Sequence, residues 1–490
     1  MVKRAPVWLW PSVRICAFTL LTGDHMDGRQ ALATVSSGAD RDAILRDAIA
    51  RARRSAFYAR HLDGYAVNGR ADLARLPLTF KDHLRDASPY GMLAVPPERA
   101  WHYHETSGTT GEPISTWCGL SEVQMMGAIV HAMVPELSTP TILLNRFPLF
   151  APVSFVFEEA LRHAGACHIA AGNLSWDVPF SRALDFIKRL KVTAFSSLPL
   201  EPILLRELAR VEGLDLKRDL GSLQVIFCGG AILPPALRRV IEKDWGARVV
   251  EIYGSNETLL MGVGCTAGKT HLCHELLEFE VLDPHTQQAV PSGQPGILTV
   301  TSLVHEVLPL VRYFTGDLVR VSDAPCACGR AGSTVECLGR SSEIVEFGGV
   351  SVTQYDLHDA AYEFADALDT RVFFIVVLRR GVRVLVEVAD PDRARAVAPE
   401  DQLRRRLGVP VQVEYLREND VLDRSALFRG PKIYKPSQIS DWRGDARKTI
   451  TIMEALLEWP RFDGRTLFHL VSRQIRNALR RRRLMREDSE

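Results

Sequence analysis

The periodicity of hydrophobic positions changes several times along the chain. Residues 40–65 carry apolar residues at helical spacing between arginines and aspartates, which predicts an amphipathic surface helix. Residues 121–320 alternate helical patterns with short β-branched runs, which read TILLN, HIAAG, VTAFSSL, LQVIFCGG and RVVEIYG. This βαβ rhythm predicts an α/β fold: a large domain whose mostly parallel sheet is covered by helices on both faces, with ligands bound at the carboxyl ends of the strands.

A different pattern begins near residue 341. The run TRVFFIVVLRRGVRVLVEVAD alternates as a β-hairpin around Arg380-Gly381, and a helical stretch and the strand-like run VPVQVEYL follow it. These elements predict a small α+β domain. The resulting division is an N-terminal extension at 1–39, a large domain at 40–339, a small C-terminal domain at 340–445 and an unassigned basic helical tail at 446–490. The extension is expected to be disordered or to lie upstream of a more natural start at Met26.

Composition narrows the class of protein. With 490 residues, 46% of them hydrophobic, and a net charge of +1, the chain is long enough for two or three cores and has the balance of a soluble globular protein. Near neutrality argues against a nucleic-acid partner. The basic stretch RQIRNALRRRRLMR is interpreted first as a solvated helix end and second as a contact for an anionic partner or a membrane surface.

The N-terminus does not qualify as an export signal. Lys3 and Arg4 precede apolar residues, but Pro11 and Arg14 interrupt that run. No stretch reaches the roughly 20 apolar residues that a membrane-spanning helix needs. Nine cysteines in a chain without an export signal predict a reducing cytoplasm, and they favour metal binding or packing over disulfides.

A loop at residues 105–111, ETSGTTG, carries the chemistry of a phosphate site. Gly108 and Gly111 allow positive φ and a close approach of backbone N–H groups to an anion. The surrounding hydroxyl donors are Thr106, Ser107, Thr109 and Thr110. An ordinary polar surface loop is the alternative for this heptapeptide alone.

The loop belongs to a series of motifs in a fixed order: LPLTFKDHL, YGMLAVP, SGTTGEP, CGGA, IYGSNET, VRYFTGD and CLGRSSEI. Over about residues 55–440 the chain resembles the phenylacetate–coenzyme A ligase branch of the acyl-adenylate-forming, or AMP-binding, enzymes. The resemblance implies ATP-dependent activation of an acid as an AMP anhydride. It also implies a mobile C-terminal domain that swings between adenylation and thioester formation.

The resemblance assigns roles to strand-end residues. Tyr253 stacks on adenine and Glu257 helps to hold the magnesium that bridges the ATP phosphates, within a segment that also includes Gly254 and Thr258. The aromatic plate suits a base, and Mg²⁺ prefers carboxylate and phosphate oxygens. The adenine-side turn is formed by Gly229, Gly230 and Ala231.

Two further motifs complete the expected nucleotide site. Asp317 accepts hydrogen bonds from the ribose hydroxyls, and Arg340 lies near the ribose and phosphate. The hinge departs from the family pattern, because Ser342 and Glu343 stand where relatives have two aspartates. This change leaves adenylation intact and puts the second half-reaction in question.

A lysine in the segment ALFRGPKIYKPSQ is expected to reach the acid and the α-phosphate. Lys432 is preferred and Lys435 is the alternate, since a mobile ammonium can neutralise charge as pyrophosphate leaves. Two lysines in a polar loop without that role are the competing interpretation, because the usual spacing of the motif is not kept.

Two cysteine-containing segments predict a structural zinc site. Thiolate and imidazole are the usual ligands of tetrahedral zinc, and four of them leave no open position. The expected ligands are Cys265, His271, Cys326 and Cys328, with Cys273 and His274 as substitutes. Some relatives carry a similar C-x-C-G-R element and an earlier Cys/His pair.

The chemistry implied is therefore an AMP-forming acid ligase that uses ATP, Mg²⁺ and coenzyme A. The acid is expected to be an aryl or short acyl carboxylate, and four phenylalanines are pocket candidates or core residues: Phe147, Phe150, Phe155 and Phe157. Other acceptors or acids stay open, namely an amine, a carrier-protein thiol, or nitrous acid in a tailoring enzyme of secondary metabolism. A degenerate nucleotide-binding scaffold is the non-catalytic alternative, and relatives are often homodimers.

Overall fold

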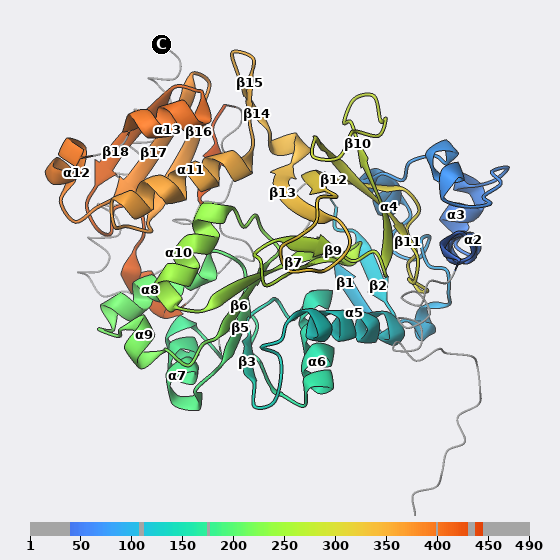
Figure 1. Ribbon diagram of the computed structural model, residues 1–490, viewed down its shortest axis with the longest axis horizontal. Coiled ribbons are helices and arrows are strands. Elements are labelled where there is room, and N and C mark those ends of the chain that lie inside the picture. The colour runs from blue at the N-terminus through green and yellow to red at the C-terminus, as the bar shows by residue number, and fades with distance from the viewer. Residues whose placement is uncertain (1–39, 107–111, 174–176, 398–399, 430–436, 444–490) are drawn as a thin grey trace, which may run out of the picture.

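The computed structural model describes residues 40–106, 112–173, 177–397, 400–429 and 437–443 (Figure 1). An 11-stranded sheet forms the body of the molecule, in the order β10-β11-β12-β13-β9-β8-β7-β6-β5-β3-β4. A four-stranded sheet with its own helices, drawn in orange, lies at one end of this body. The predicted extension at 1–39 and the predicted tail at 446–490 lie outside the described residues.

Half of the large sheet is parallel. Its strands are β3 (Ile142–Asn145), β4 (Cys167–Ala170), β5 (Ala194–Ser197), β6 (Val225–Gly229) and β7 (Arg248–Ser255). These are the five β-branched runs of the sequence, so the predicted α/β class is confirmed. Alternate residues of β6 face opposite cores: Val225 and Phe227 join one, and Ile226 and Cys228 join the other. Both faces are buried, as parallel sheets require.

The other half of the sheet is antiparallel, which the sequence pattern did not reveal. It consists of β8 (Leu259–Gly264), β9 (Thr270–Leu272), β10 (Leu277–Leu282), β11 (Pro295–Ser302), β12 (Tyr313–Ser322) and β13 (Thr334–Arg340). Only residues 256–258 separate β7 from β8. A parallel neighbour would need a crossover of a dozen or more residues, so this short link makes the pairing antiparallel.

Helices cover the two faces. One face is covered by α5 (Leu120–Met133) and α6 (Pro152–Ala164), and the other by α7 (Phe180–Leu190), α8 (Glu201–Val211) and α10 (Pro235–Trp245). The amphipathic helix predicted at 40–65 is two helices, α2 (Arg41–Ala52) and α3 (Ala56–His61). The break occurs at Ser55, whose hydroxyl accepts a hydrogen bond from the Tyr58 N–H at 3.1 Å and so starts the second helix.

The small sheet has the order β18-β17-β16-β19. Its strands are β16 (Phe373–Leu378), β17 (Gly381–Glu387), β18 (Val411–Leu416) and β19 (Ile439–Asp441), with helices α11 (Gln354–Ala367), α12 (Pro391–Val397) and α13 (Glu400–Leu407). The predicted hairpin is the β16–β17 pair. The last strand of the large sheet ends at Arg340, and the short hairpin of β14 (Val345–Phe347) and β15 (Val350–Val352) follows it. A division of the chain near residue 340 stays a prediction.

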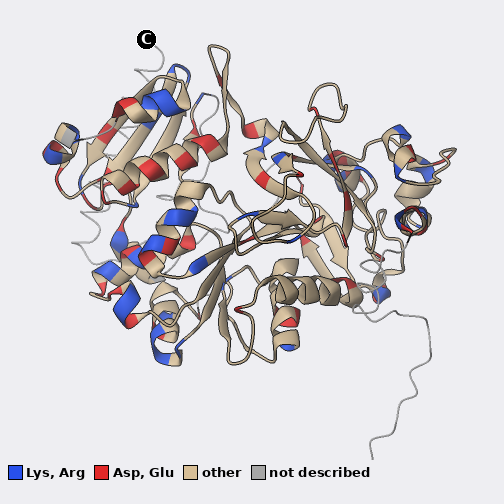
Figure 2. Cartoon of the chain, in the orientation of Figure 1, with Lys and Arg blue, Asp and Glu red and all other residues tan. Residues whose placement is uncertain are grey.

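The small domain packs against α8 and α10 through a continuous hydrophobic core and buried ion pairs. Figure 2 shows charged residues of both signs on the helices where the two parts meet. Arg371, with only 1% of its side chain exposed, lies 2.8 Å from Asp244 of α10. Arg424 lies 2.7 Å from Glu207 of α8 and 2.7 Å from Glu387 of β17. Burial raises the pKa of Glu387 and Arg424 opposes that shift.

We expect Arg424→Met to destabilise this docked arrangement by roughly 3 kcal/mol, because it leaves buried carboxylates without their guanidinium partner. Urea unfolding of the full chain measures the effect. The matched control is Arg395→Met, since Arg395 pairs with Asp392 in an exposed position, where a change below about 1 kcal/mol is expected. Equal destabilisation by the two variants would contradict a structural role for the buried pair.

Candidate active site

The turn between β7 and β8 presents the predicted adenine and magnesium residues. Gly254 is required there, since a Cβ at this position would lie 2.1 Å from the carbonyl oxygen of Leu259. Thr258 is fully buried; its N–H donates to the Ser255 hydroxyl at 3.1 Å, and the two hydroxyl oxygens are 2.9 Å apart. Thr258 therefore holds the turn together, and a direct contact between Thr258 and nucleotide stays a prediction.

Asp317 lies between two of the other predicted residues. The Tyr253 hydroxyl donates to its Oδ2 at 3.0 Å, and Arg340 Nη1 lies 2.9 Å from its Oδ1. Burial raises the pKa of Tyr253 and the Asp317 carboxylate adds to the shift, so the phenol stays protonated and donates. Each carboxylate oxygen has two lone pairs, which leaves acceptor capacity for a vicinal diol. The structure thus brings Tyr253, Asp317 and Arg340 together.

Glu257, the predicted magnesium ligand, is 6% exposed and has a partner that sequence reasoning missed. Lys81 Nζ lies 3.7 Å from its Oε1. Lys81 begins helix α4 (Lys81–Asp86). Two residues earlier, Thr79 pairs with the start of β12: its N–H donates to Arg312 O at 3.0 Å, and the Phe314 N–H donates to Thr79 O at 2.8 Å. The LPLTFK motif contained this lysine, but nothing in its spacing indicated which distant carboxylate it would meet.

The adenine-side turn follows β6. A Cβ at Gly229 would lie 2.5 Å from the carbonyl oxygen of Ile252 on β7, so only glycine lets the two strand ends approach this closely. Gly230 has φ +74°, and it is exposed together with Ala231. Backbone of this turn is therefore open to a ligand at the strand ends, which agrees with the predicted role of these three residues without testing it.

The predicted phosphate loop is held at both ends. It connects β1 (His102–Glu105) to β2 (Ser115–Cys118), which form an antiparallel pair. Thr106 closes the pair, since its N–H donates to Ile114 O and its hydroxyl accepts from the Ile114 N–H, both at 3.0 Å. Asn256 Nδ2 donates to Glu105 O at 2.8 Å, which ties the loop base to the β7–β8 turn. The rest of the loop, namely Ser107, Gly108, Thr109, Thr110 and Gly111, lies outside the described residues, as do Lys432 and Lys435.

The four candidate pocket phenylalanines separate into two groups. Phe147 and Phe157 are almost fully buried and pack on each other, with ring centroids 5.6 Å apart, which makes them core residues. Phe150 is 55% exposed, and Phe155 is half-buried with its ring stacked on His102 at 3.8 Å. Only the second pair lies near β1 and the loop.

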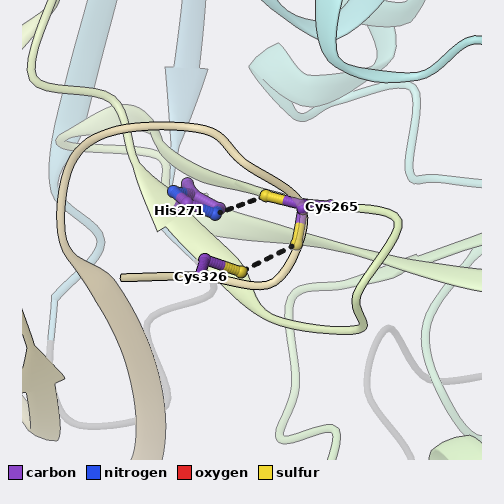
Figure 3. A group of neighbouring side chains, drawn as sticks. Cys265, His271 and Cys326 are labelled. Carbon is purple, nitrogen blue, oxygen red and sulfur yellow. Dashed lines mark hydrogen bonds between the residues drawn. The ribbon is translucent and has the colours of Figure 1, made fainter. Parts of the chain in front are cut away.

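The predicted zinc ligands converge from β8, β9 and the loop before β13. The four ligand atoms of Cys265, His271, Cys326 and Cys328 all lie within 4.8 Å of one another. Figure 3 shows Cys265, His271 and Cys326 with their side chains directed toward one another. The Sγ atoms of Cys265 and Cys326 are 3.8 Å apart, and Cys328 Sγ lies 3.3 Å from His271 Nε2. Three thiols and one imidazole at this spacing are the donor set of a closed tetrahedral zinc site.

Comparison with known proteins agrees with this geometry. The family model described as AMP-binding enzyme matches residues 96–303, which include the loop and the β7–β8 turn. The phenylacetate–coenzyme A ligase of Thermus thermophilus is 28% identical over 358 residues, covering 69% of this chain and 78% of the relative. That of Pseudomonas putida is 28% identical over 376 residues, covering 72% and 82%.

Residues 96–303 thus match the AMP-binding enzyme family, and the chain is similar to phenylacetate–coenzyme A ligases. Solved structures share its fold. 2-Hydroxyisobutyryl-CoA ligase in its postadenylation state, bound to 2-HIB-AMP, has a TM-score of 0.70 at 21% identity, covering 85% of this chain and 90% of that one. The same ligase in its thioesterification state has a TM-score of 0.57 at 22% identity, with coverages of 83% and 90%.

Within the described ranges, no helix is both long and apolar enough to cross a membrane.

Lys81→Met is expected to lower kcat/KM for ATP by about 10- to 100-fold, since a cation beside Glu257 would hydrogen-bond a charged phosphate oxygen. Initial rates of acid-dependent ATP consumption measure the loss. Lys188→Met, on the exposed side of α7, is the control and should leave the rate unchanged. If Lys81→Met behaves like this control, the lysine acts only as a surface ion pair.

Purified enzyme is expected to contain one zinc per chain, measured by inductively coupled plasma mass spectrometry. Cys328→Ser should lose the metal and lower the melting temperature, because a structural zinc contributes folding free energy. Cys167→Ser is the control, since Cys167 is an exposed cysteine outside the cluster. Retention of full zinc content by Cys328→Ser would rule out this ligand set.

Proposed function

We propose that this enzyme activates an organic acid with ATP and then transfers the acyl group to coenzyme A. In the first step a carboxylate oxygen attacks the α-phosphorus, the bond to the β-phosphate breaks, and pyrophosphate leaves. In the second step the coenzyme A sulfur attacks the acyl carbon and AMP leaves. The observation that carries the proposal is the grouping of Tyr253, Glu257 and Asp317 around Arg340.

Asp317 and Arg340 would bind the ribose and the nearby phosphate, and Tyr253 would contact the base. All three side chains are already held by their own polar contacts, and Tyr253 and Asp317 are also buried, so little reorganisation is needed when the nucleotide binds. Fixed donors and acceptors of this kind contribute to rate by orienting the reacting groups. We assign the same positioning role to the exposed backbone of Gly230 and Ala231.

Glu257 fits a magnesium-binding role. It is a buried carboxylate at a strand end, and magnesium in nucleotide sites is usually held by one or two carboxylates together with phosphate oxygens. The ion would offset phosphate charge during departure of pyrophosphate. Lys81, at 3.7 Å, would be released from Glu257 when that carboxylate binds a cation, and its ammonium would then face the phosphates.

The second half-reaction requires a different placement of the small domain in our proposal. The docked arrangement has a higher TM-score to the postadenylation state than to the thioesterification state of the related fold. Passing to another arrangement would separate Arg371 from Asp244 and Arg424 from Glu207. Ser342 and Glu343 are expected to serve as the hinge, and Lys432 or Lys435 to complete the adenylation site.

The remaining features follow from the same proposal. A zinc ion bound by the cysteine cluster would have a structural role, since the four protein ligands leave no open position. Free thiols at eight described cysteines are consistent with a reducing cytoplasm as the place of action. A homodimeric state and a role in secondary metabolism are further expectations of the family resemblance.

Pyrophosphate release from Mg-ATP, measured across aromatic, aliphatic and inorganic acids with and without coenzyme A, tests the proposal. Release with one carboxylic acid that increases with coenzyme A is the expected result. Glu257→Gln should lower this release by about 100-fold or more, because it removes a buried charge from the phosphate site. Glu212→Gln, at the exposed end of α8, should not.

Other outcomes would direct the assignment elsewhere. Pyrophosphate release at a rate that does not change with coenzyme A would contradict thioester formation and favour an amine or a carrier-protein thiol as acceptor. Release with nitrite alone would identify nitrous acid as the substrate. ATP binding without release for any acid, unaffected by Glu257→Gln, would contradict the enzyme proposal and favour a nucleotide-binding scaffold.

A further inference from the structure

His104 is a buried side chain that the proposed chemistry leaves unexplained. It lies on β1, is 2% exposed, and neither of its ring nitrogens has a hydrogen-bond partner among the described residues. It is the one described histidine with both nitrogens in that state. Buried polar groups are normally hydrogen-bonded, and an unpaired one costs free energy, so this histidine requires a partner that the described residues do not supply.

The position of His104 connects it with the substrate. It stands two residues before Thr106, at the base of the loop predicted to bind the ATP phosphates. The acid must approach the α-phosphate, so its body has to extend from that loop into neighbouring structure. Asn256, in the β7–β8 turn that also carries Glu257, donates to the backbone of Glu105, the residue between His104 and Thr106.

Aromatic rings surround His104. Its ring centroid lies 5.8 Å from that of Phe150, 5.8 Å from that of Phe155 and 5.6 Å from that of His102. Phe150 belongs to the segment that follows the carboxyl end of β3, and Phe155 belongs to α6. Strand ends in α/β sheets are where ligands bind, which places these rings on the side of the sheet that the acid must occupy.

The surroundings of His104 limit which chemical groups can serve as its hydrogen-bond partner. Burial, together with a smaller effect of the neighbouring His102, lowers the pKa of His104 to about 4, so the imidazole is neutral at neutral pH. A neutral imidazole offers one donor and one acceptor. Among apolar rings an isolated charged partner would be costly, whereas a hydroxyl or amino group can complement either nitrogen.

We propose that His104 is a specificity-determining residue that hydrogen-bonds a hydroxyl or amino substituent on the body of the acid. The inference rests on the proposed function and deepens it, because it narrows the substrate class to aryl or short acyl acids that carry such a group. In this arrangement the carboxylate of the acid stays free to attack the α-phosphorus, and Phe150 and Phe155 contact the apolar part of the substrate.

Acid-dependent ATP–pyrophosphate exchange with matched acids tests this assignment. Suitable pairs are benzoate against its hydroxy and amino derivatives, and propionate against lactate. We expect the wild-type enzyme to prefer a substituted acid by at least about tenfold in kcat/KM, the value of one buried hydrogen bond. His104→Phe should remove that preference and leave kcat/KM for the unsubstituted partner within about threefold.

Two further variants separate recognition from structure. His104→Gln keeps a donor and an acceptor and should retain part of the preference. His131→Phe makes the same chemical change near the end of α5, where the ring of His131 stacks on that of His163, and should leave the preference intact. Thermal melting of each variant shows whether it still folds. If His104→Phe does not fold, the substrate preference of His104→Gln alone tests the assignment.

The possible failures are distinguishable. If no acid supports exchange in the wild-type enzyme, the proposed function fails. If acids support exchange but no pair shows a preference, or if His104→Phe lowers both members of a pair equally, the function stands and the assignment of His104 is overturned.

Discussion

The change from parallel to antiparallel pairing at β7 is the constraint on which the rest of the site depends. Because only residues 256–258 link β7 to β8, the chain must turn back at once, and the turn places the buried Glu257 at the strand end. The antiparallel half then brings β12 and β13 into the same sheet, where Asp317 and Arg340 stand opposite each other in register. The described part of the site at β7, β12 and β13 is thus assembled by sheet topology.

The docked small domain introduces a conflict between stability and movement. Arg371 and Arg424 each hold carboxylates from both sides of the interface, in positions almost closed to water. Charges buried in this way stabilise one arrangement strongly only while every partner stays in place, because each becomes costly once separated. An enzyme that must rotate this domain would have to hydrate these groups as they separate, so the same pairs that fix the first arrangement would slow departure from it.

The sequence allowed the fold class and the five parallel strands to be predicted, because buried β-branched runs between helical patterns leave few alternatives. It did not show the antiparallel half, whose strands carry no comparable period. The convergence of Tyr253 with Asp317 and of Cys265 with Cys326 followed from motif order alone. By contrast, Lys81 and His104 could not be assigned from local pattern. Lys81 meets Glu257, and His104 meets Phe150, across more than 40 residues of chain. The unpaired ring nitrogens of His104 are likewise visible only in the folded structure.

The charges of the described site also bear on how it meets ATP. Lys81 and Arg340 are each paired with a carboxylate, Glu257 and Asp317, so the four groups cancel and offer no net positive charge to a polyphosphate. Nucleotide binding therefore requires an exchange of partners.

The ribose hydroxyls can add to Asp317 without displacing Arg340, since each carboxylate oxygen accepts more than one hydrogen bond. Glu257 would have to release Lys81 before that ammonium could face a phosphate, and a divalent cation held by Glu257 would give the carboxylate a new partner and add positive charge. Under the proposed function, the neutrality of the site would therefore make its use of ATP depend on a metal ion, and the Lys81–Glu257 pair would couple phosphate binding to cation binding.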